Sequence, residues 1–597
     1  MDNQKLFNIR HSLAHIMAAA VGEMFPKANL GVGPVVENGF YYDFLLPRPL
    51  TPEDLKKLEK RMRALVQEKL SFERMEMSFK EAKKFFSERG QTFKVELIND
   101  IEKFGTTNAD LVLNQESKNP VSVSDKVSLY KSGKFIDLCR GPHVANTSEI
   151  KSDAFKLNKI SGAYWRGDQT KPQLQRIYGL AFETKEELEK YLKLLEEAEK
   201  RDHKILGPKL DLFMFHETAP GMPYWLPKGV ILYNELVSFW RQEHKERGYQ
   251  EIVSPLLNKK GLYVTSGHFE HYWENMFTCK TAENEEYGVK AMNCPNAHVV
   301  FASKLRSYRD LPLRFGDTDT LHRFELSGAL NGLLRVREFR QDDAHIYLSE
   351  DMVESEYKEV FKIIKRFYSA FGIKYSFRLG TRPEKFMGDT ATWDRAEVAL
   401  EKILKSSGVE YHIEKGDGAF YGPKVDILMK DALERQWQMG TVQLDFQQPR
   451  RFNLEYIDKD GSRKIPVCIH RVIYGSLERF IGILIEHYAG AFPLWLAPVQ
   501  VAILPISKKQ NGYAKKVLKE LTTYNSQLRT ELDDRDESVG KKIRDASMQK
   551  IPYQIIVGEK EVKSKKIAVR TREGKDLGQM GLKKFMKKIQ MEIEKKK

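Results

Sequence analysis

The chain lacks membrane-length apolar runs, a secretory leader and a disulfide framework. Even residues 481–496 are interrupted by two ionisable residues and a proline, whereas a membrane-spanning helix needs roughly 20 apolar residues. The N-terminus, MDNQKLFNIRH, has no signal-peptide core. The four cysteines are scattered, at Cys139, Cys279, Cys294 and Cys468. These absences exclude membrane-spanning and disulfide-stapled secreted classes, and they predict a protein of the reducing cytoplasm.

Length and charge bound the architecture and the partner. At 597 residues the chain is too long for one core, so roughly three or four domains are expected. With 41% apolar and 30% charged residues it is typical of soluble globular proteins. The net charge is +15, and residues 499–597 hold 25 Lys and Arg against 13 Asp and Glu, so about +12 of the excess lies in the last sixth. This balance predicts a polyanionic partner.

The most informative stretch is residues 321–347, LHRFELSGALNGLLRVREFRQDDAHIY. Two runs with strand propensity, 321–326 and 334–348, flank a segment whose Gly and Asn favour a turn, which predicts an antiparallel hairpin. Because strand side chains alternate, Arg323 and Glu325 would share one face of the first strand. One face of the second strand would carry Arg335, Arg337, Phe339, Gln341, Asp343 and His345.

The alternative for this hairpin is a solvated outer face, but solvent rarely demands a Phe in the middle of one. Two arginines could hold phosphates in a bidentate way, and Phe339 could stack on a base. The stretch resembles motif 2 of the class II aminoacyl-tRNA synthetases, in the form found in the threonyl-tRNA synthetase family. The resemblance runs from the first residues to the last.

The resemblance implies a multidomain fold of mixed α/β and α+β type. The expected segments are an α+β editing domain at 1–183, a linker helix at 184–202, a class II catalytic domain with an antiparallel sheet at 203–497, and an α/β anticodon-binding domain at 498–597. Family members usually carry a small ubiquitin-like domain ahead of the editing domain, and this chain starts too late to contain it. The implied partners are tRNA(Thr), ATP with Mg²⁺, L-threonine and a second copy of the chain, with no membrane.

Two further class II motifs are present. Residues 248–255, which follow the helical stretch 232–247, resemble motif 1, whose helix, strand and proline build the dimer interface. Residues 475–480 open an apolar helix and resemble motif 3, in which Arg479 would hold the ATP γ-phosphate. An ordinary helix-surface arginine is the alternative for Arg479.

The resemblance also implies roles for single residues around ATP. Arg323 would grip the α-phosphate and Arg335 would point towards the γ-phosphate. Phe339 would stack on adenine and Glu325 would contact its amino edge. Gln438 and Thr441 complete the ATP side. His268 would lie near the tRNA terminal ribose, where it could move a proton, and the residues expected to act in catalysis are Arg323, Arg479, His268 and Lys424.

Three distant segments each supply one zinc ligand, at Cys294, His345 and His470. Singly, each is more often a buried thiol or a hydrogen-bonded histidine, but together they resemble the zinc site of the family's catalytic domain. Three protein ligands leave the metal's coordination open for substrate, and in the family threonine's amino and hydroxyl groups take it. The implied threonine-binding residues are Met292, Gln341, Asp343, Tyr421 and Gln443.

A metal that binds a hydroxyl explains why a second pocket is needed. Valine cannot ligate and is rejected, whereas serine lacks only one methyl, which discriminates by roughly 1–3 kcal/mol. Serine should therefore be attached in error and need removal.

The N-terminal part carries two clusters of metal-binding side chains, one of two histidines and one of a cysteine and a histidine. At helical spacing His11 and His15 share one face, and with Cys139 and His143 they would make a zinc site on chemistry alone. The sequences HSLAH, LCRGPH and SGAYWRGD resemble the family's editing domain. That implies hydrolysis of seryl-tRNA by a positioned water without a required metal, with Lys94 and Asp137 in water activation and substrate binding. Bound zinc is the alternative.

The remaining segments are a helix and a basic domain. Residues 184–201 read as a linking helix, with a short coiled coil as the alternative. From residue 499, strand-like and helical segments alternate, which predicts a small doubly wound α/β domain. The resemblance implies anticodon binding, with Glu561 and Arg570 contacting anticodon bases; a solubilising basic domain is the alternative.

Three rival functions remain to be weighed. A prolyl-tRNA synthetase is disfavoured by the trio Cys294, His345 and His470. A synthetase-like regulator that binds RNA without catalysis would not need the ATP arginines. A free-standing editing hydrolase would not need the residues beyond about 202.

Overall fold

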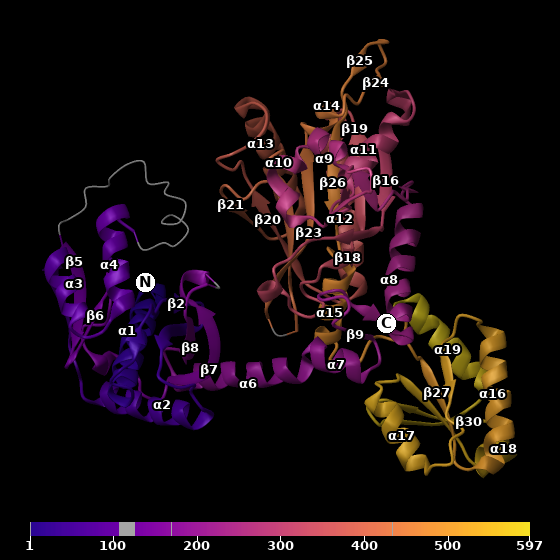
Figure 1. Ribbon diagram of the computed structural model, residues 1–597. Helices are drawn as coiled ribbons and strands as arrows, with labels where there is room; N and C mark the ends of the chain where they lie inside the picture. The colour runs from indigo at the N-terminus through magenta and orange to yellow at the C-terminus, as the bar shows by residue number, and fades with distance from the viewer. Residues whose placement is uncertain (1, 107–125, 169, 433, 597) are drawn as a thin grey trace. The chain divides into compact units, whose positions relative to one another are not determined.

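The computed structural model describes residues 2–106, 126–168, 170–432 and 434–596. The chain divides into two compact units, Met1–Glu196 and Glu197–Lys597, whose elements are labelled in Figure 1. No described helix is long and apolar enough to cross a membrane.

The N-terminal unit is an α+β structure built around the long helix α1 (Asp2–Met24). One sheet has the order β1-β3-β8-β7, with β2 paired to β3, and a second has the order β4-β5-β6. The strands are β1 (Asn29–Leu30), β2 (Val35–Val36), β3 (Gly39–Leu45), β4 (Phe72–Ser78), β5 (Lys126–Ser132), β6 (Phe135–Leu138), β7 (Phe155–Tyr164) and β8 (Gln173–Ala181). The other helices are α2 (Pro52–Gln67), α3 (Phe79–Ser87) and α4 (Thr92–Phe104).

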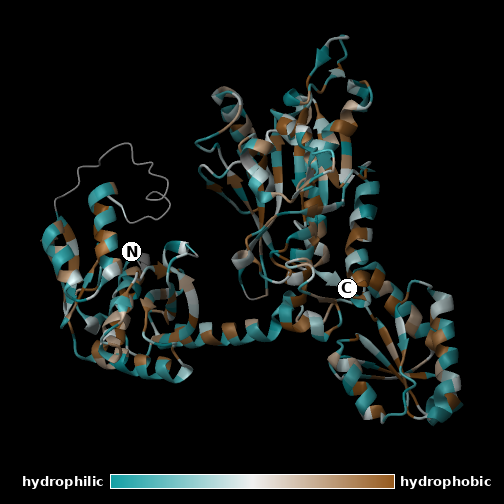
Figure 2. Cartoon of the chain, viewed as in Figure 1, coloured by the Kyte–Doolittle hydropathy of each residue, from teal (hydrophilic) through white to brown (hydrophobic). Residues whose placement is uncertain are grey.

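The apolar face of α1 places its two histidines. Leu13, Met17 and Val21 are fully buried in a cluster with residues of α2 and β3. Thr51 with Asp54 and Ser78 with Glu81 form capping boxes that begin α2 and α3. The linking helix is α6 (Lys185–Arg201). Hydrophilic residues predominate along it (Figure 2), and Leu188 is its buried residue.

An eight-stranded, mainly antiparallel sheet forms the centre of the second unit. Its order is β11-β16-β19-β26-β23-β22-β20-β21. The strands are β11 (Gln250–Glu251), β16 (Leu313–Asp317), β19 (Asp343–Leu348), β20 (Tyr375–Gly380), β21 (Tyr411–Glu414), β22 (Lys424–Lys430), β23 (Gln436–Asp445) and β26 (Val467–Val472). Two pairs are parallel, β11 with β16 and β20 with β21.

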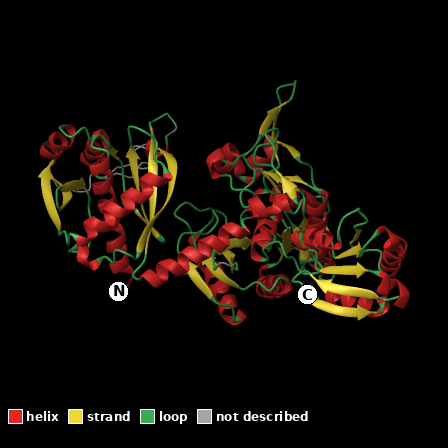
Figure 3. Ribbon diagram, turned by 90° about the horizontal axis from the view of Figure 1, so that it is seen from below, coloured by secondary structure: helices red, strands yellow, loops and turns green. Residues whose placement is uncertain are grey.

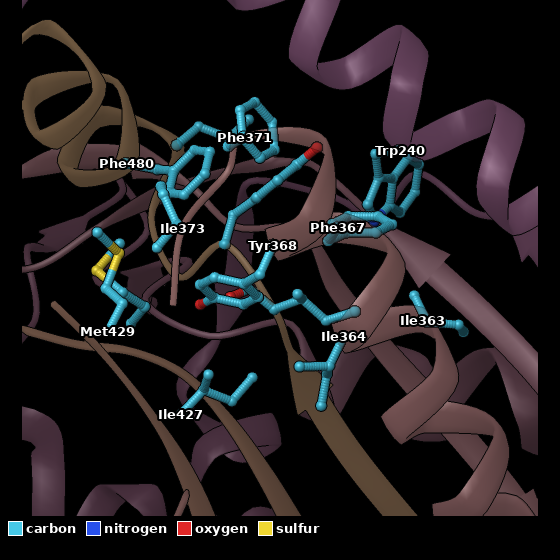
Figure 4. Packing of buried hydrophobic residues seen from close by; sticks show 14 of the residues in the cluster. Trp240, Ile363, Ile364, Phe367, Tyr368, Phe371, Ile373, Ile427, Met429 and Phe480 are labelled. Atoms are coloured by element: carbon cyan, nitrogen blue, oxygen red, sulfur yellow. The ribbon is translucent and has the colours of Figure 1, made fainter. Parts of the chain in front are cut away.

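Helices bury one face of this sheet. One core holds Trp240 of α8 (Pro227–Lys245), Phe367 of α12 (Val353–Ala370), Phe371 directly after α12, Phe480 of α15 (Leu477–His487) and strand residues such as Ile427 (Figure 4). Because this face is apolar and packed, polar side chains on the strands are left to the opposite face.

Shorter elements surround the sheet. The helices are α7 (His203–Lys209), α9 (Lys260–Ser266), α10 (His268–Tyr272), α11 (Cys294–Ala302), α13 (Thr390–Ser407) and α14 (Gln448–Arg451). The strands are β9 (Phe213–Met214), β10 (Tyr224–Trp225), β12 (Leu257–Lys259), β13 (Thr278–Lys280), β14 (Glu286–Val289), β15 (Arg306–Ser307), β17 (Thr320–His322), β18 (Glu338–Arg340), β24 (Tyr456–Ile457) and β25 (Arg463–Lys464).

The predicted hairpin is antiparallel, but its predicted extent and faces are wrong. β17 and β18 pair over three residues each, with Leu321 opposite Phe339. Residues 323–337 between them form an irregular loop, so Arg323, Glu325, Arg335 and Arg337 lie on no strand face. β18 and β19 also belong to different sheets. The break between them is fixed by Asp342, whose carboxylate accepts the backbone N–H of Ile473 (3.0 Å) and Tyr474 (2.9 Å).

The C-terminal part is the predicted α/β domain. Its sheet has the order β28-β27-β29-β30-β31, parallel across the first three strands and antiparallel beyond. Alternate residues of β27 face α16 and α19 on one side and α17 on the other, so helices cover both faces (Figure 3). The elements are β27 (Val501–Pro505), α16 (Asn511–Tyr524), β28 (Thr530–Leu532), α17 (Val539–Met548), β29 (Tyr553–Val557), α18 (Glu559–Ser564), β30 (Ile567–Thr571), β31 (Asp576–Met580) and α19 (Leu582–Glu594).

Candidate active sites

A cavity of about 440 Å³ lies over the polar face of the eight-stranded sheet. Strands β19, β23 and β26 supply its floor, and the start of α11 and residues 419–421 supply its walls. The sequence-predicted residues that line it are His268, Met292, Cys294, Arg323, Gln341, Asp343, His345, Tyr421, Thr441, Gln443 and His470. The fold therefore brings every residue predicted to bind threonine or metal into one cavity.

Three donor side chains meet in this cavity. Cys294 opens α11, while His345 and His470 are directly opposite on the neighbouring strands β19 and β26. All three are buried, and their ligand atoms lie within 4.8 Å of one another. The two imidazole rings are 4.9 Å apart between centroids.

The hydrogen bonds of these residues leave atoms available for a metal. His470 Nε2 is 2.9 Å from Oδ2 of Asp445, which leaves Nδ1 as the ring atom for a metal. Among the described residues, Nδ1 of the His345 imidazole is buried and has no hydrogen-bond partner. A buried imidazole without a partner is costly, and one thiol with two imidazoles is a donor set that suits zinc. The trio therefore fits the predicted ion.

A third histidine near the trio, His298 on α11, was not predicted. His298 is buried, its Nδ1 is 2.9 Å from the hydroxyl of Tyr347, and burial lowers its pKa to about 3. Its ring lies 5.9 Å from that of His470. The i, i+4 spacing from Cys294 was the sequence signal that could have identified it, because both side chains then lie on one helix face.

The amino-acid side of the cavity is held by buried hydrogen bonds. Nδ2 of Asn293 donates to Oδ2 of Asp343 (3.2 Å), and the hydroxyl of Tyr421 bonds the amide of Gln443. Burial raises the pKa of Asp343 to about 6, with the charge of His470 opposing that shift. Asn293 was not predicted, although it is adjacent to Cys294.

Of the arginines predicted to bind ATP, Arg323 lines this cavity, whereas Arg335 lines another cavity of about 520 Å³. Nε of Arg479 donates to the carbonyl of Leu334 (2.9 Å), and Nε of Arg335 donates to Glu325 (2.9 Å). Burial lowers the pKa of Arg479, and the nearby positive charges of Arg335 and Arg323 lower it further. Crowded guanidinium groups of this kind are suited to a polyphosphate.

The other predicted ATP-side residues lie beside the cavity lining. Phe339 is 5% exposed and packs with Leu321 and Val336, and the Arg323 guanidinium lies 5.0 Å from its ring centroid. Nζ of Lys424 pairs with Asp417 (3.1 Å) and Asp426 (3.2 Å).

A buried carboxylate that was not predicted organises this region. Oδ1 of Asp426 accepts the hydroxyl of Thr441 (2.8 Å), and Oδ2 accepts NH2 of Arg378 (2.7 Å), which also donates to Oε1 of Gln438 (2.8 Å). Asp426 therefore connects three residues predicted to bind the substrates: Thr441 and Lys424 directly, and Gln438 through Arg378.

The predicted editing residues also converge. A cavity of about 390 Å³ in the N-terminal unit is lined by His11, His15, Lys94, Asp137 and Cys139. His143 lies against it, because Sγ of Cys139 is 3.3 Å from Nε2 of both His11 and His143. The ligand atoms of His11, His15, Cys139 and His143 lie within 4.8 Å of one another.

The chemistry of this pocket is set by burial. Burial lowers the pKa of His11, lowers that of His15 further, and takes that of His143 to about 2, so all three rings are neutral at pH 7. Burial raises the pKa of Cys139 to about 11, which keeps the thiol protonated.

A buried ion pair forms the pocket's floor. Nζ of Lys94 is 2.6 Å from Oδ1 of Asp137, and both side chains are at most 3% exposed. The hydroxyl of Tyr42 donates to Oδ2 of Asp137 (2.5 Å) and accepts from Lys94 (2.8 Å). Tyr42 was missed because it comes from β3, and no motif in the sequence connects it to the pocket.

The two predicted anticodon residues lie in the C-terminal domain. Glu561 on α18 accepts the backbone N–H of Gly558 (2.9 Å) and contacts Gln579 of β31. Arg570 is on β30, in register with Gln554 and Asp576 of the neighbouring strands.

Three segments match known family profiles. Residues 127–178 match the "Threonyl and Alanyl tRNA synthetase second additional domain". Residues 277–488 match the "tRNA synthetase class II core domain (G, H, P, S and T)", and residues 500–592 match the "Anticodon binding domain".

Relatives match along nearly the whole chain. The threonine-tRNA ligase of Clostridium tetani is 48% identical over 593 residues, which covers 99% of this chain and 89% of that protein. The threonine-tRNA ligase of Clostridioides difficile is 49% identical over 585 residues, covering 98% and 88%.

Two solved synthetase structures also match this chain. The RNA binding domain of threonyl-tRNA synthetase from Cryptosporidium parvum Iowa II matches with a TM-score of 0.63 at 41% identity, covering 65% of this chain and 98% of that one. The prolyl-tRNA synthetase of Cryptosporidium parvum matches with a TM-score of 0.50 at 18% identity, covering 65% and 74%, which is a likeness of fold.

Proposed function

The chain belongs to the threonine-tRNA ligase family, and we propose that its two cavities divide the work of such an enzyme. It uses ATP to attach L-threonine to tRNA(Thr) through a threonyl-adenylate, and it hydrolyses seryl-tRNA(Thr) formed in error. One observation carries the proposal for the first reaction: the donor trio and all five residues predicted to bind threonine line one cavity.

Adenylate formation is assigned to the arginine side of this cavity. The threonine carboxylate attacks the α-phosphorus of ATP, and pyrophosphate leaves. Arg323 would neutralise the α-phosphate, with Arg335 and Arg479 on the γ-phosphate, while ATP carries Mg²⁺. Positioning and charge neutralisation supply most of the acceleration in such displacements. Lys424, Gln438 and Thr441, linked through Asp426, would hold the remainder of the nucleotide.

Threonine is assigned to the metal side. Cys294, His345 and His470 would hold zinc, which when bound supplies open positions for the amino and hydroxyl groups of threonine. Gln341, Asp343, Tyr421, Gln443 and Met292 would surround the amino acid. The buried hydrogen bonds of Asp343 and Tyr421 fix these side chains before substrate arrives.

Transfer to tRNA needs a proton acceptor at the terminal ribose. The ribose hydroxyl attacks the carbonyl carbon of the adenylate, and AMP leaves. His268 is buried, lines the cavity, and has Nδ1 2.8 Å from Oγ of Ser266. His268 would accept the hydroxyl proton.

The N-terminal cavity is assigned to hydrolysis of the seryl ester. Its neutral histidines can take a proton from an attacking water, whereas the protonated thiol of Cys139 is a poor nucleophile. Water then adds to the ester carbon, and the tRNA ribose oxygen leaves with a proton. Lys94, which pairs with Asp137, would stabilise the developing negative oxygen.

Three further properties extend this proposal. Val253 in motif 1 is 80% exposed, and Leu256 and Leu257 just after it are 43% and 51% exposed, which supports burial of this surface in a homodimer. The basic C-terminal domain would bind the anticodon, with contacts from Glu561 and Arg570. A cytoplasmic location is in keeping with the four free cysteines.

The first test is amino-acid-dependent exchange between ATP and pyrophosphate. We expect strong exchange with threonine, weak exchange with serine, none with valine or proline, and loss of exchange when zinc is removed. Exchange specific for proline would refute the assignment of the cavity, and exchange unaffected by metal removal would refute the assignment of the trio.

The second test is hydrolysis of preformed seryl-tRNA(Thr). We expect His11→Ala to abolish hydrolysis and to leave threonine-dependent exchange unchanged, because the two cavities lie in separate units. Removal of metal should leave hydrolysis intact. If removing the metal also abolished hydrolysis, that result would instead favour zinc in the N-terminal pocket.

A further inference from the structure

His203 is a buried histidine whose two ring nitrogens both have partners. It opens α7, and its exposed fraction is 0%. The backbone N–H of Leu333 donates to Nε2 (3.0 Å), and Nδ1 lies 2.7 Å from Oε1 of Glu486. Because a backbone N–H can only donate, Nε2 carries the lone pair and Nδ1–H donates to the carboxylate. The partners thus assign one tautomer.

The Leu333 end of this link lies in the loop that carries Arg335. Gly332 has a φ of +50°, and a Cβ there would lie 2.3 Å from Nε2 of His203, so the imidazole lies directly against the loop backbone. The N–H of Asn331 donates to the carbonyl of Arg335 (3.2 Å), which closes the turn. His203 therefore holds this turn at its centre.

The Glu486 end lies on α15, two helical turns after Arg479. The other carboxylate oxygen of Glu486 pairs with Arg435. A Cβ at Gly482 would lie 3.1 Å from Cβ of Leu333 and 3.6 Å from Cδ2 of His203, so helix, loop and imidazole meet closely at this glycine. Since Arg479 itself bonds the carbonyl of Leu334, loop and helix are joined at two points.

From these contacts we propose that His203 is a positioning residue for ATP, which sets the spacing between Arg335 and Arg479 by bridging the loop to α15. The proposal rests on the assignment of those two arginines to ATP made above. His203 acts through them: its nitrogens are taken by Leu333 and Glu486, and neither is free for substrate. A displaced loop would leave one arginine out of reach of the phosphates, and small misplacements of such groups weaken substrate binding and rate.

A cation site is the competing use of this cluster. Asp202, His203 and Glu486 place ligand atoms within 4.8 Å of one another. However, Nε2 of His203 accepts from Leu333, Nδ1 carries a proton, and Glu486 already pairs with Arg435. Because a ligating imidazole must offer a lone pair, the hydrogen bonds favour the positioning role.

Two substitutions separate the two bonds. His203→Asn places an amide N–H near the position of Nδ1, so it keeps the donor to Glu486 and loses the acceptor for Leu333. His203→Gln places an amide oxygen near the position of Nε2, so it keeps the acceptor for Leu333 and loses the donor. His487→Asn is the matched control, since this histidine is adjacent to Glu486 on α15 and its ring packs on Tyr488.

The measurement is KM for ATP and KM for threonine in ATP-pyrophosphate exchange by the full-length protein, normalised by active-site titration. We expect His203→Asn to raise KM for ATP about tenfold and His203→Gln about threefold, with KM for threonine unchanged. His487→Asn should behave as the unsubstituted chain. Seryl-tRNA hydrolysis on the same samples reports that the N-terminal unit is intact.

A purely structural role would lower the titrated fraction of active sites and leave both KM values unchanged. The proposal is overturned if neither His203 variant raises KM for ATP relative to KM for threonine, or if the His487 variant raises it equally. Absence of exchange with the unsubstituted chain would instead refute the proposed function.

Discussion

Replacing Asp445 by asparagine should weaken zinc binding without removing any proposed ligand. The carboxylate is fully buried, and its Oδ2 accepts Nε2–H of His470 (2.9 Å). Its Oδ1 accepts the backbone N–H of Gln447 (2.7 Å) and Gln448 (3.0 Å). Asparagine keeps Oδ1 and its two backbone bonds, but it presents an NH2 group to His470.

The consequence is a change of tautomer. An NH2 group can only donate, so Nε2 of His470 must offer a lone pair, and the imidazole proton moves to Nδ1, the atom left for a metal. Loss of such an orienting partner typically costs about 10–100-fold in metal affinity, which corresponds to about 1.4–2.8 kcal/mol.

The assay is competition for zinc between the full-length protein and a chromophoric chelator. Asp431→Asn is the matched control, because Asp431 is also buried but pairs with Arg435. Zinc affinity within twofold of the unsubstituted chain for Asp445→Asn, or an equal loss for Asp431→Asn, would refute the reasoning.

Three further predictions concern the other domains. Lys94→Met should abolish seryl-tRNA hydrolysis and lower the free energy of unfolding of the N-terminal unit, measured by urea titration, by about 3–5 kcal/mol, because it leaves the buried Asp137 without its paired lysine. The double variant Lys94→Met with Asp137→Asn should recover the stability but not the hydrolysis. Equal stability of the single and double variants would contradict this. Burial lowers the pKa of His143 from 6.5 to about 2, so below pH 6.5 the unfolded chain binds a proton that the folded pocket does not. The stability of the N-terminal unit should therefore be complete above pH 6.5 and fall as the pH decreases below it. Urea titrations at several pH values would show this. Arg570→Gln should weaken tRNA(Thr) binding and leave threonine-dependent exchange unchanged; unaltered tRNA affinity would remove Arg570 from the interface.

Local elements were well predicted where side-chain chemistry acts within a few residues. The helix predicted at 184–201 is α6 (Lys185–Arg201), and the strands and helices predicted to alternate from residue 499 are present as β27, α16, β28, α17 and β29. The loop at 323–337 was not predictable in the same way. Its residues have strand propensity, but its backbone is held by distant partners, such as His203 and Arg479, that no local pattern contains.

In the candidate sites, residues within motifs were predicted, and the residues that support them were not. Residues in recognisable motifs, such as Cys294 and His470, were placed by resemblance, and the structure brings them together. Residues that support them were missed: Asp426, Tyr42 and His203 are buried polar groups with satisfied partners. Their partners come from elsewhere in the chain, so a buried hub of this kind becomes visible only when the fold is known.

The opposed placement of His345 and His470 would give a bound zinc ion a use in folding. The two residues are direct register partners on β19 and β26, and a slip of one residue would turn one imidazole to the apolar face of the sheet. Only correctly paired chains could then hold the ion. The fraction of freshly synthesised chains that binds zinc would thus equal the fraction whose strands β19 and β26 are paired in the correct register. A chelator present during refolding would remove the preference for this register.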